Sequence, residues 1–275
     1  MNFRVFLIVC LSSLPITVAA QSPAFTLQGN TIHDYQPSLE QASKQLAQLL
    51  AIEPSEIPHL QIVLNKTATE NQNYQQNAPS EPLLILSEDL LEKKQRANET
   101  MASVVAHEAC HLWLIELAKQ RGLEQVKQGY LPSYGHSQFN DWFDEMVAVA
   151  CEQGALAEQR RQADFSFIPL ATYLTQMHPV YERMQAQIAA AVAAQKAKKS
   201  GGQSVVKLTV EDENFADFYR QSAYFAEFLM RQPEQISIDK WLHVAQEKDP
   251  EIIASKLGFE NLAKFEQAFY QFIPW

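Results

Sequence analysis

The sequence reads His107-Glu108-Ala109-Cys110-His111 in the middle of an apolar stretch that predicts a buried helix from about Thr100 to Gln120. Because the two histidines are four residues apart, they lie one turn apart on one face of that helix, where two ring nitrogens can bind one metal ion. Imidazoles and a carboxylate are costly inside an apolar helix unless something satisfies them. We therefore expect a metal site with His107 and His111 as ligands. Glu108 points off that axis and is suited to hold a water molecule.

The third metal ligand must come from elsewhere in the chain, because a catalytic zinc ion takes three protein ligands and leaves one position open. Glu145 lies on a second predicted helix that starts near Asn140, and His136 lies in the loop just before it. We favour Glu145, because a helical carboxylate is better anchored than a loop histidine. His136 remains the alternative third ligand, or a substrate contact. Two histidines and a carboxylate are typical zinc ligands, so we expect one Zn²⁺ per chain.

Six positions on these two predicted helices form one combined pattern: His107, Glu108, His111, Trp142, Glu145 and Ala148. The pattern resembles the gluzincin zinc metallopeptidases, which include the peptidase MA-like and aminopeptidase-N-like catalytic cores. The resemblance implies a zincin-like fold in which His107, His111 and Glu145 bind zinc and Glu108 is the general base.

The chain also departs from that family. Met146 stands where many members have glycine, and Val149 stands where thermolysin-like members have an Asp that supports a zinc-bound histidine. A rival resemblance is to the SprT-like zinc peptidases, which take a third histidine from a Gly-His segment followed by an aromatic residue. Gly135, His136 and Phe139 partly fit that pattern.

A later segment, from Phe218 to Leu229, resembles a helix of the gluzincin catalytic cores. There a tyrosine at the position of Tyr219 reaches the zinc site and stabilises the oxyanion, so the resemblance implies this catalytic role for Tyr219. Without the resemblance, Tyr219 would be interpreted as a core residue, because its neighbours form an apolar helical stripe. The resemblance extends roughly from Asn98 to Phe272.

The hydrophobic pattern predicts an α+β fold that is mostly α. Residues 38–52 have the periodicity of a helix, and residues 59–64 and 83–86 are short β-like runs that predict a small sheet. From Glu99 onward the pattern is helical almost to the end, and a third long helix is expected from about Pro169. We expect residues 21–275 to form a single zincin-like domain with a small sheet followed by a helical C-terminal half.

The first twenty residues have the pattern of a cleaved secretory signal. Arg4 supplies a positive charge, Val5 to Leu11 form a short apolar stretch, and Val18-Ala19-Ala20 provides small residues before the expected cleavage site. The apolar stretch is shorter than a membrane span requires. We therefore expect an exported protein, periplasmic or secreted, without stable membrane insertion after cleavage.

Charge and cysteine content narrow the function further. The 275 residues carry a formal net charge of −10 with no cluster of Lys or Arg, which argues against a nucleic-acid or anionic-membrane partner. Cleavage of the signal would leave Cys110 and Cys151 as a pair in a compartment that permits disulfides. The two residues are therefore either bridged or buried as free thiols.

These observations together favour an exported zinc metallopeptidase that acts on peptides or proteins. In this hypothesis Glu108 is the general base and Tyr219 the oxyanion donor. The chain has no Gly-x-Met-Glu-Asn segment, with which aminopeptidase-N enzymes capture a free amine, so an endopeptidase is slightly favoured. Leu83 to Leu86 would then be an edge strand that pairs with an extended substrate. The alternative is a non-catalytic exported binding or scaffold protein that retains a peptidase-like fold.

Overall fold

The computed structural model describes residues 24–29, 32–65, 83–87, 101–125, 135–161, 166–197 and 215–273. The expected signal peptide, residues 1–20, lies outside the described residues, and its cleavage and the export of the chain stay predictions. Among the described helices, none is both long and apolar enough to cross a membrane.

The sheet has three parallel strands in the order β1-β2-β3. They are β1 (Phe25–Gly29), β2 (Leu60–Asn65) and β3 (Leu83–Ser87), with Phe25 opposite Leu60 and Gln61 opposite Leu83. The two expected strands are present, and β1 is one that the sequence analysis missed. The central strand β2 is apolar and buried, which is typical of a parallel sheet covered by helices.

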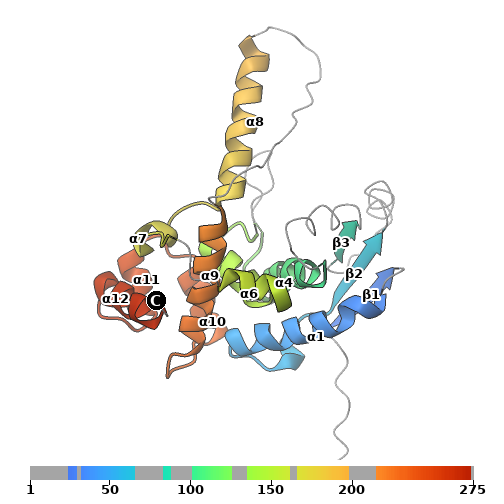
Figure 1. Ribbon diagram of the computed structural model, residues 1–275, viewed down its shortest axis with the longest axis horizontal. Helices are drawn as coiled ribbons and strands as arrows, with labels where there is room; N and C mark the ends of the chain where they lie inside the picture. The colour runs from blue at the N-terminus through green and yellow to red at the C-terminus, as the bar shows by residue number, and fades with distance from the viewer. Residues whose placement is uncertain are drawn as a thin grey trace, which may run out of the picture.

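Helices make up most of the described chain, which confirms the mostly α, α+β fold class (Figure 1). Their bounds are α1 (Ile32–Leu49), α4 (Met101–Gln120), α5 (Asp141–Ala150), α6 (Gly154–Arg160), α7 (Leu170–Tyr173), α8 (Pro179–Ala197), α9 (Phe215–Met230), α10 (Ile238–Ala245), α11 (Pro250–Lys256) and α12 (Leu262–Phe272), with a short 3₁₀ turn at Pro54–Glu56.

For two helices, the bounds predicted from the sequence are wrong. The helix expected from about Pro169 is instead the short α7 and the separate α8, which begins at Pro179. A proline disfavours helical backbone in the residue before it, so the chain turns there and restarts. The helix expected over residues 38–52 begins earlier, at Ile32, and ends at Leu49. By contrast, α4 ends where expected, with Gly122 just beyond it at φ +83°.

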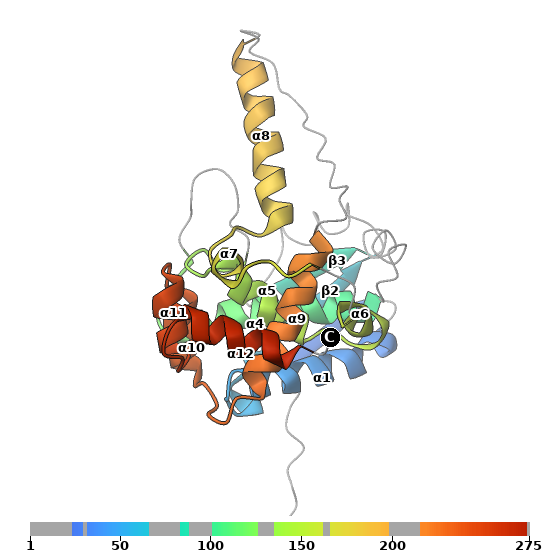
Figure 2. The ribbon, with the colours of Figure 1, turned by 60° about the vertical axis from the view of Figure 1, so that its left-hand side comes forward.

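Helix α5 lies at the centre of the packing, between α4 and α9, while α4 also packs on α1 and on strands β2 and β3. Eight residues of α5 are buried, from Trp142 to Val149. Trp142 meets Phe225 of α9 edge to face, with ring centroids 5.5 Å apart. Helix α8 stands away from this body in both views (Figures 1 and 2). The contacts of α5 on two sides bring its polar side chains close to α4.

A disulfide joins Cys110 of α4 to Cys151 at the end of α5. Their Cα atoms are 6.6 Å apart, within the range that a disulfide spans. Of the two possibilities left open by the sequence, the structure has the bridged pair.

Candidate metal centre

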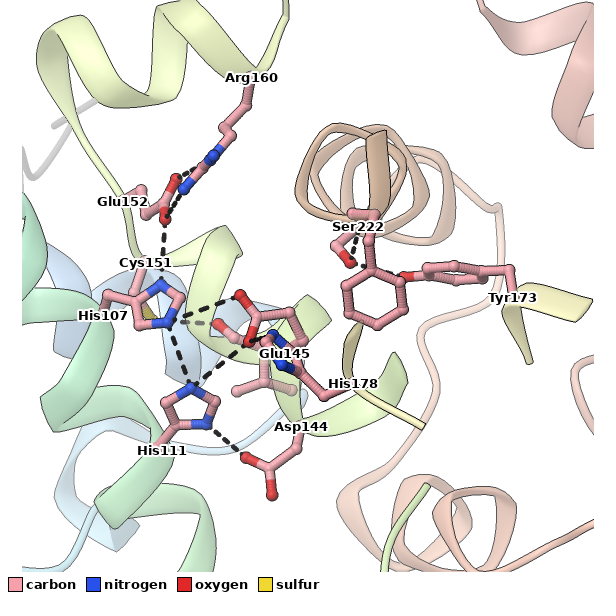
Figure 3. A network of polar contacts seen from close by, with 12 residues as sticks. His107, His111, Asp144, Glu145, Cys151, Glu152, Arg160, Tyr173, His178 and Ser222 are labelled. Carbon is pink, nitrogen blue, oxygen red and sulfur yellow. Dashed lines mark hydrogen bonds and ion pairs between the residues drawn. The ribbon is translucent and has the colours of Figure 1, made fainter. Parts of the chain in front are cut away.

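The predicted histidine pair and Glu145 come together in the core. His107 and His111 lie one turn apart on α4, with their Nε2 atoms 3.2 Å apart. Glu145 reaches them from α5: its Oε1 lies 3.6 Å from Nε2 of His107, and its Oε2 lies 3.8 Å from Nε2 of His111 (Figure 3). One ligand atom from each of the three residues lies within 4.8 Å of the others. This largely buried group can hold a metal ion.

Each imidazole has a carboxylate on its other nitrogen. Nδ1 of His107 lies 3.0 Å from Oε1 of Glu152, and Nδ1 of His111 lies 2.5 Å from Oδ1 of Asp144. A carboxylate accepts a hydrogen bond, so Nδ1 of each ring is the donor, and in the neutral imidazole that binds a metal Nε2 keeps its lone pair. Both lone pairs therefore belong to the nitrogens that face Glu145, which is the arrangement found around metal-ligating histidines.

The sequence of α5 explains where these carboxylates lie. Asp144 is in the first turn of the helix, where the helix dipole favours negative charge. Glu152 lies between Cys151, the C-cap of α5, and the start of α6 at Gly154. Neither supporting carboxylate was predicted from the sequence. The sequence offered no signal for Glu152, because α5 ends at Ala150 and its helical period does not extend to that residue.

The site has a strongly negative electrostatic environment. Burial lowers the pKa of His111, but nearby carboxylates, with Asp144 first, raise it more, to about 9. Burial raises the pKa of Glu145, but the surrounding imidazoles, with His107 first, hold it well below its usual range. The carboxylates of Asp144, Glu145 and Glu152 are buried around the two imidazoles, whereas the guanidinium of Arg160 pairs with Glu152 alone among them. The excess negative charge favours a cation at the imidazoles.

His178 is a further site residue that the sequence analysis missed. It is buried just before α8, its backbone N–H donates to Oδ2 of Asp141, and its Nε2 lies 3.5 Å from Oε2 of Glu145. It comes from a distant part of the chain with no spacing that links it to the histidine pair. Only the packing of the His178 segment against α5 brings it to Glu145.

His136 is not part of the metal-binding group. Its ring is stacked on Phe139, Nδ1 accepts from the backbone N–H of Gln138, and Nε2 lies 3.2 Å from the carbonyl oxygen of Leu123. Both ring nitrogens therefore contact the loop itself. Burial also lowers the pKa of His136. The structure thus brings Glu145 to the histidine pair and keeps the alternative third ligand within the loop.

The two expected catalytic residues lie near this group. Glu108 is half-buried on α4, between the two histidines in sequence, and its charge contributes to the raised pKa of His111. Tyr219 is half-buried on α9, and its ring centroid is 5.5 Å from that of His178. Tyr219 is therefore separated from Glu145 by one imidazole.

Comparisons with known proteins give no assignment: no protein-family model, no curated protein and no solved structure matches this chain.

Proposed function

We propose that this protein is a zinc-dependent metallopeptidase with His107, His111 and Glu145 as its metal ligands. One observation carries the proposal: two imidazoles from one helix turn their Nε2 atoms toward a buried carboxylate, while separate carboxylates hold their Nδ1 atoms. A core histidine needs hydrogen-bond partners, but it does not need this convergence of three ligand atoms.

The spacing of the ligand atoms suits zinc. Ligands about 2.0–2.2 Å from a tetrahedral ion lie roughly 3.3–3.6 Å from one another. The corresponding separations here are 3.2, 3.6 and 3.8 Å, so only small movements are needed. Two imidazoles and one carboxylate also form a common ligand set of catalytic zinc, which leaves one position open.

The chain's own residues supply the proton transfers. When bound, zinc provides a Lewis acid that polarises the scissile carbonyl and makes water more acidic. Glu108 accepts a proton from the attacking water as the new C–O bond forms and the carbonyl oxygen becomes an oxyanion. It then passes the proton to the nitrogen of the leaving amine, so that the peptide C–N bond breaks as the C=O bond forms again. Tyr219 donates a hydrogen bond to the carbonyl oxygen as it gains negative charge.

The substrate is proposed to be an extended peptide, and the enzyme an endopeptidase. Strand β3 is an edge strand among the described strands, and it packs against α4. An edge strand offers backbone groups with which an extended peptide can pair. The position of β3 beside the histidine helix supports this mode of binding.

The disulfide supports an exported protein. Disulfides persist in oxidising compartments and are rare where thiols are kept reduced. This chain has such a bridge, between Cys110 and Cys151. We therefore propose a periplasmic or secreted location.

The proposal is tested by measuring the metal content of the purified mature protein and its cleavage of unfolded casein. We expect about one zinc per chain and cleavage that a chelator abolishes and added zinc restores. Stoichiometric zinc without cleavage of casein or of a peptide library would favour the alternative, a non-catalytic binding protein. A protein that binds no divalent metal would contradict both the metal site and the peptidase.

A further inference from the structure

Arg160 lies where two parts of the site meet, and nothing in the sequence pattern pointed to it. We propose that Arg160 is a positioning residue, which holds Glu152 behind the ligand His107 and at the same time holds the ring of Tyr219. This inference rests on the proposed function and assigns a role within that site.

The contact of Arg160 with Glu152 is made through two bonds. Nε donates to Oε2 at 3.0 Å and Nη2 donates to Oε1 at 3.2 Å. The side chain of Glu152 is 1% exposed and that of Arg160 is 12% exposed, so the pair is largely buried. Oε1 also faces Nδ1 of His107 at 3.0 Å. The planar guanidinium therefore fixes the orientation of the carboxylate, and the carboxylate fixes the imidazole.

The same guanidinium contacts the proposed oxyanion donor. Its central carbon lies 4.4 Å from the ring centroid of Tyr219, the geometry of a cation–π contact. The Tyr219 ring also meets His178 edge to face, and Nε2 of His178 lies 3.5 Å from Oε2 of Glu145. A continuous path of contacts thus leaves one metal ligand, His107, and returns to another, Glu145. Arg160 is the only cationic side chain of that path other than its histidines.

The fold explains why Arg160 can contact both elements. It is the last residue of α6, a short helix that begins two residues after Glu152 and packs against α9, the helix of Tyr219. The next residue provides a matched control. Arg161 lies 3.7 Å from Glu227, and its side chain is 57% exposed. Arg160 and Arg161 are therefore neighbours in sequence with the same charge, but Arg160 contacts Glu152 and Tyr219, whereas Arg161 pairs with Glu227.

The first test replaces Arg160 by lysine, which keeps the charge but loses the planar two-bond contact and the stacking on the ring. We expect zinc affinity to fall by about 10-fold or more in R160K and further in R160Q, as for other residues that orient a metal ligand. R161K and R161Q are expected to bind zinc like the wild type. Competition with a chromophoric chelator measures the affinity.

The path of contacts also predicts which variants change zinc affinity and which change kcat. E152Q should weaken zinc binding chiefly through His107, and Y219F should lower kcat with little change in zinc affinity. R160K should both weaken zinc binding and lower kcat. The values of kcat and KM are measured at saturating zinc. Its cobalt-substituted form should show a visible absorption spectrum shifted from that of the R161K form, because the ligand geometry changes.

The outcomes separate this inference from the proposed function. A wild-type protein that binds no metal overturns the proposed function. A wild type that binds zinc, together with an R160K variant whose zinc affinity, cobalt spectrum and kcat equal those of R161K, overturns the role of Arg160 alone. Reduced thermal stability of R160K without any of these changes would also overturn it, since that is the result expected from a purely structural residue.

Discussion

Gly135 and Asp144 are in such close contact that no side chain fits at position 135: a Cβ placed there would lie 1.8 Å from Oδ2 of Asp144. The same oxygen accepts the backbone N–H of His136 at 2.5 Å, while Oδ1 faces Nδ1 of His111. The loop before α5 is therefore shaped around the carboxylate that orients a metal ligand.

Gly135→Ala is expected to weaken metal binding. Gly135 has φ +50°, so the new side chain both strains the backbone and displaces Asp144 from His111. We expect zinc affinity to fall by about 10-fold. Gly122→Ala is the matched control, because Gly122 also has a positive φ but a Cβ there meets nothing within 4 Å. Equal zinc affinity in the two variants would contradict the role of the Gly135–Asp144 contact.

Glu108→Gln is expected to keep the metal and lose the activity. The amide cannot accept the proton of the attacking water, so kcat should fall by about 10²–10⁴-fold while the zinc content stays the same. Glu116→Gln on the same helix serves as the control, because Glu116 pairs with Lys119 near the surface. Full activity of purified Glu108→Gln would rule out Glu108 as the general base.

Glu145→Ala is expected to lose the metal, whereas His136→Ala is expected to keep it. Glu145 places one side-chain oxygen near each Nε2 atom, whereas the ring nitrogens of His136 contact the backbone of Gln138 and Leu123. Elemental analysis of the two purified variants measures the difference. Loss of metal in His136→Ala with retention in Glu145→Ala would assign the third ligand to the loop instead.

The stability of the metal-free protein is expected to decrease with pH above 6.5. The pKa of His111 rises from 6.5 to about 9 on folding, so its ion pair with Asp144 stabilises the fold fully below pH 6.5 and is lost as the pH rises through about 9. Urea unfolding across this interval measures the decline. It should be smaller in Asp144→Asn and absent in the zinc-loaded protein, where the metal replaces the proton. A rise in stability across the interval would contradict this assignment.

The disulfide is expected to stabilise the fold by about 4 kcal/mol, because it closes a loop between cysteines 41 residues apart. Urea unfolding of a Cys110→Ala, Cys151→Ala double variant, without zinc, measures this loss. A thiol reductant should destabilise the wild type by a similar amount and leave the double variant unchanged. An unchanged unfolding free energy in the double variant would show that the bridge does not stabilise the fold.

Parts of the fold were predictable because they depend on short-range patterns. The apolar stretch around His107 predicts α4 almost to the residue, and Gly122 marks its end. Strand β1 was missed because its sequence, Phe-Thr-Leu-Gln-Gly, has no continuous apolar run, unlike the equally short β3. The break before Pro179 was missed because the pattern on both sides of it is helical.

The sequence by itself determined that two imidazoles face the same way, because a helical period of 3.6 residues fixes the relation of positions four apart. It also supplied both candidates for the third ligand, but it gave no physical means to bring either one to α4. Only the tertiary structure decided that Glu145 meets the histidines and that Asp144 and Glu152 orient them. It also decided that Arg160 contacts Glu152 and that His178 contacts Glu145. These contacts join segments far apart in the chain, and their distances depend on how α5, α6 and α9 pack around the buried core.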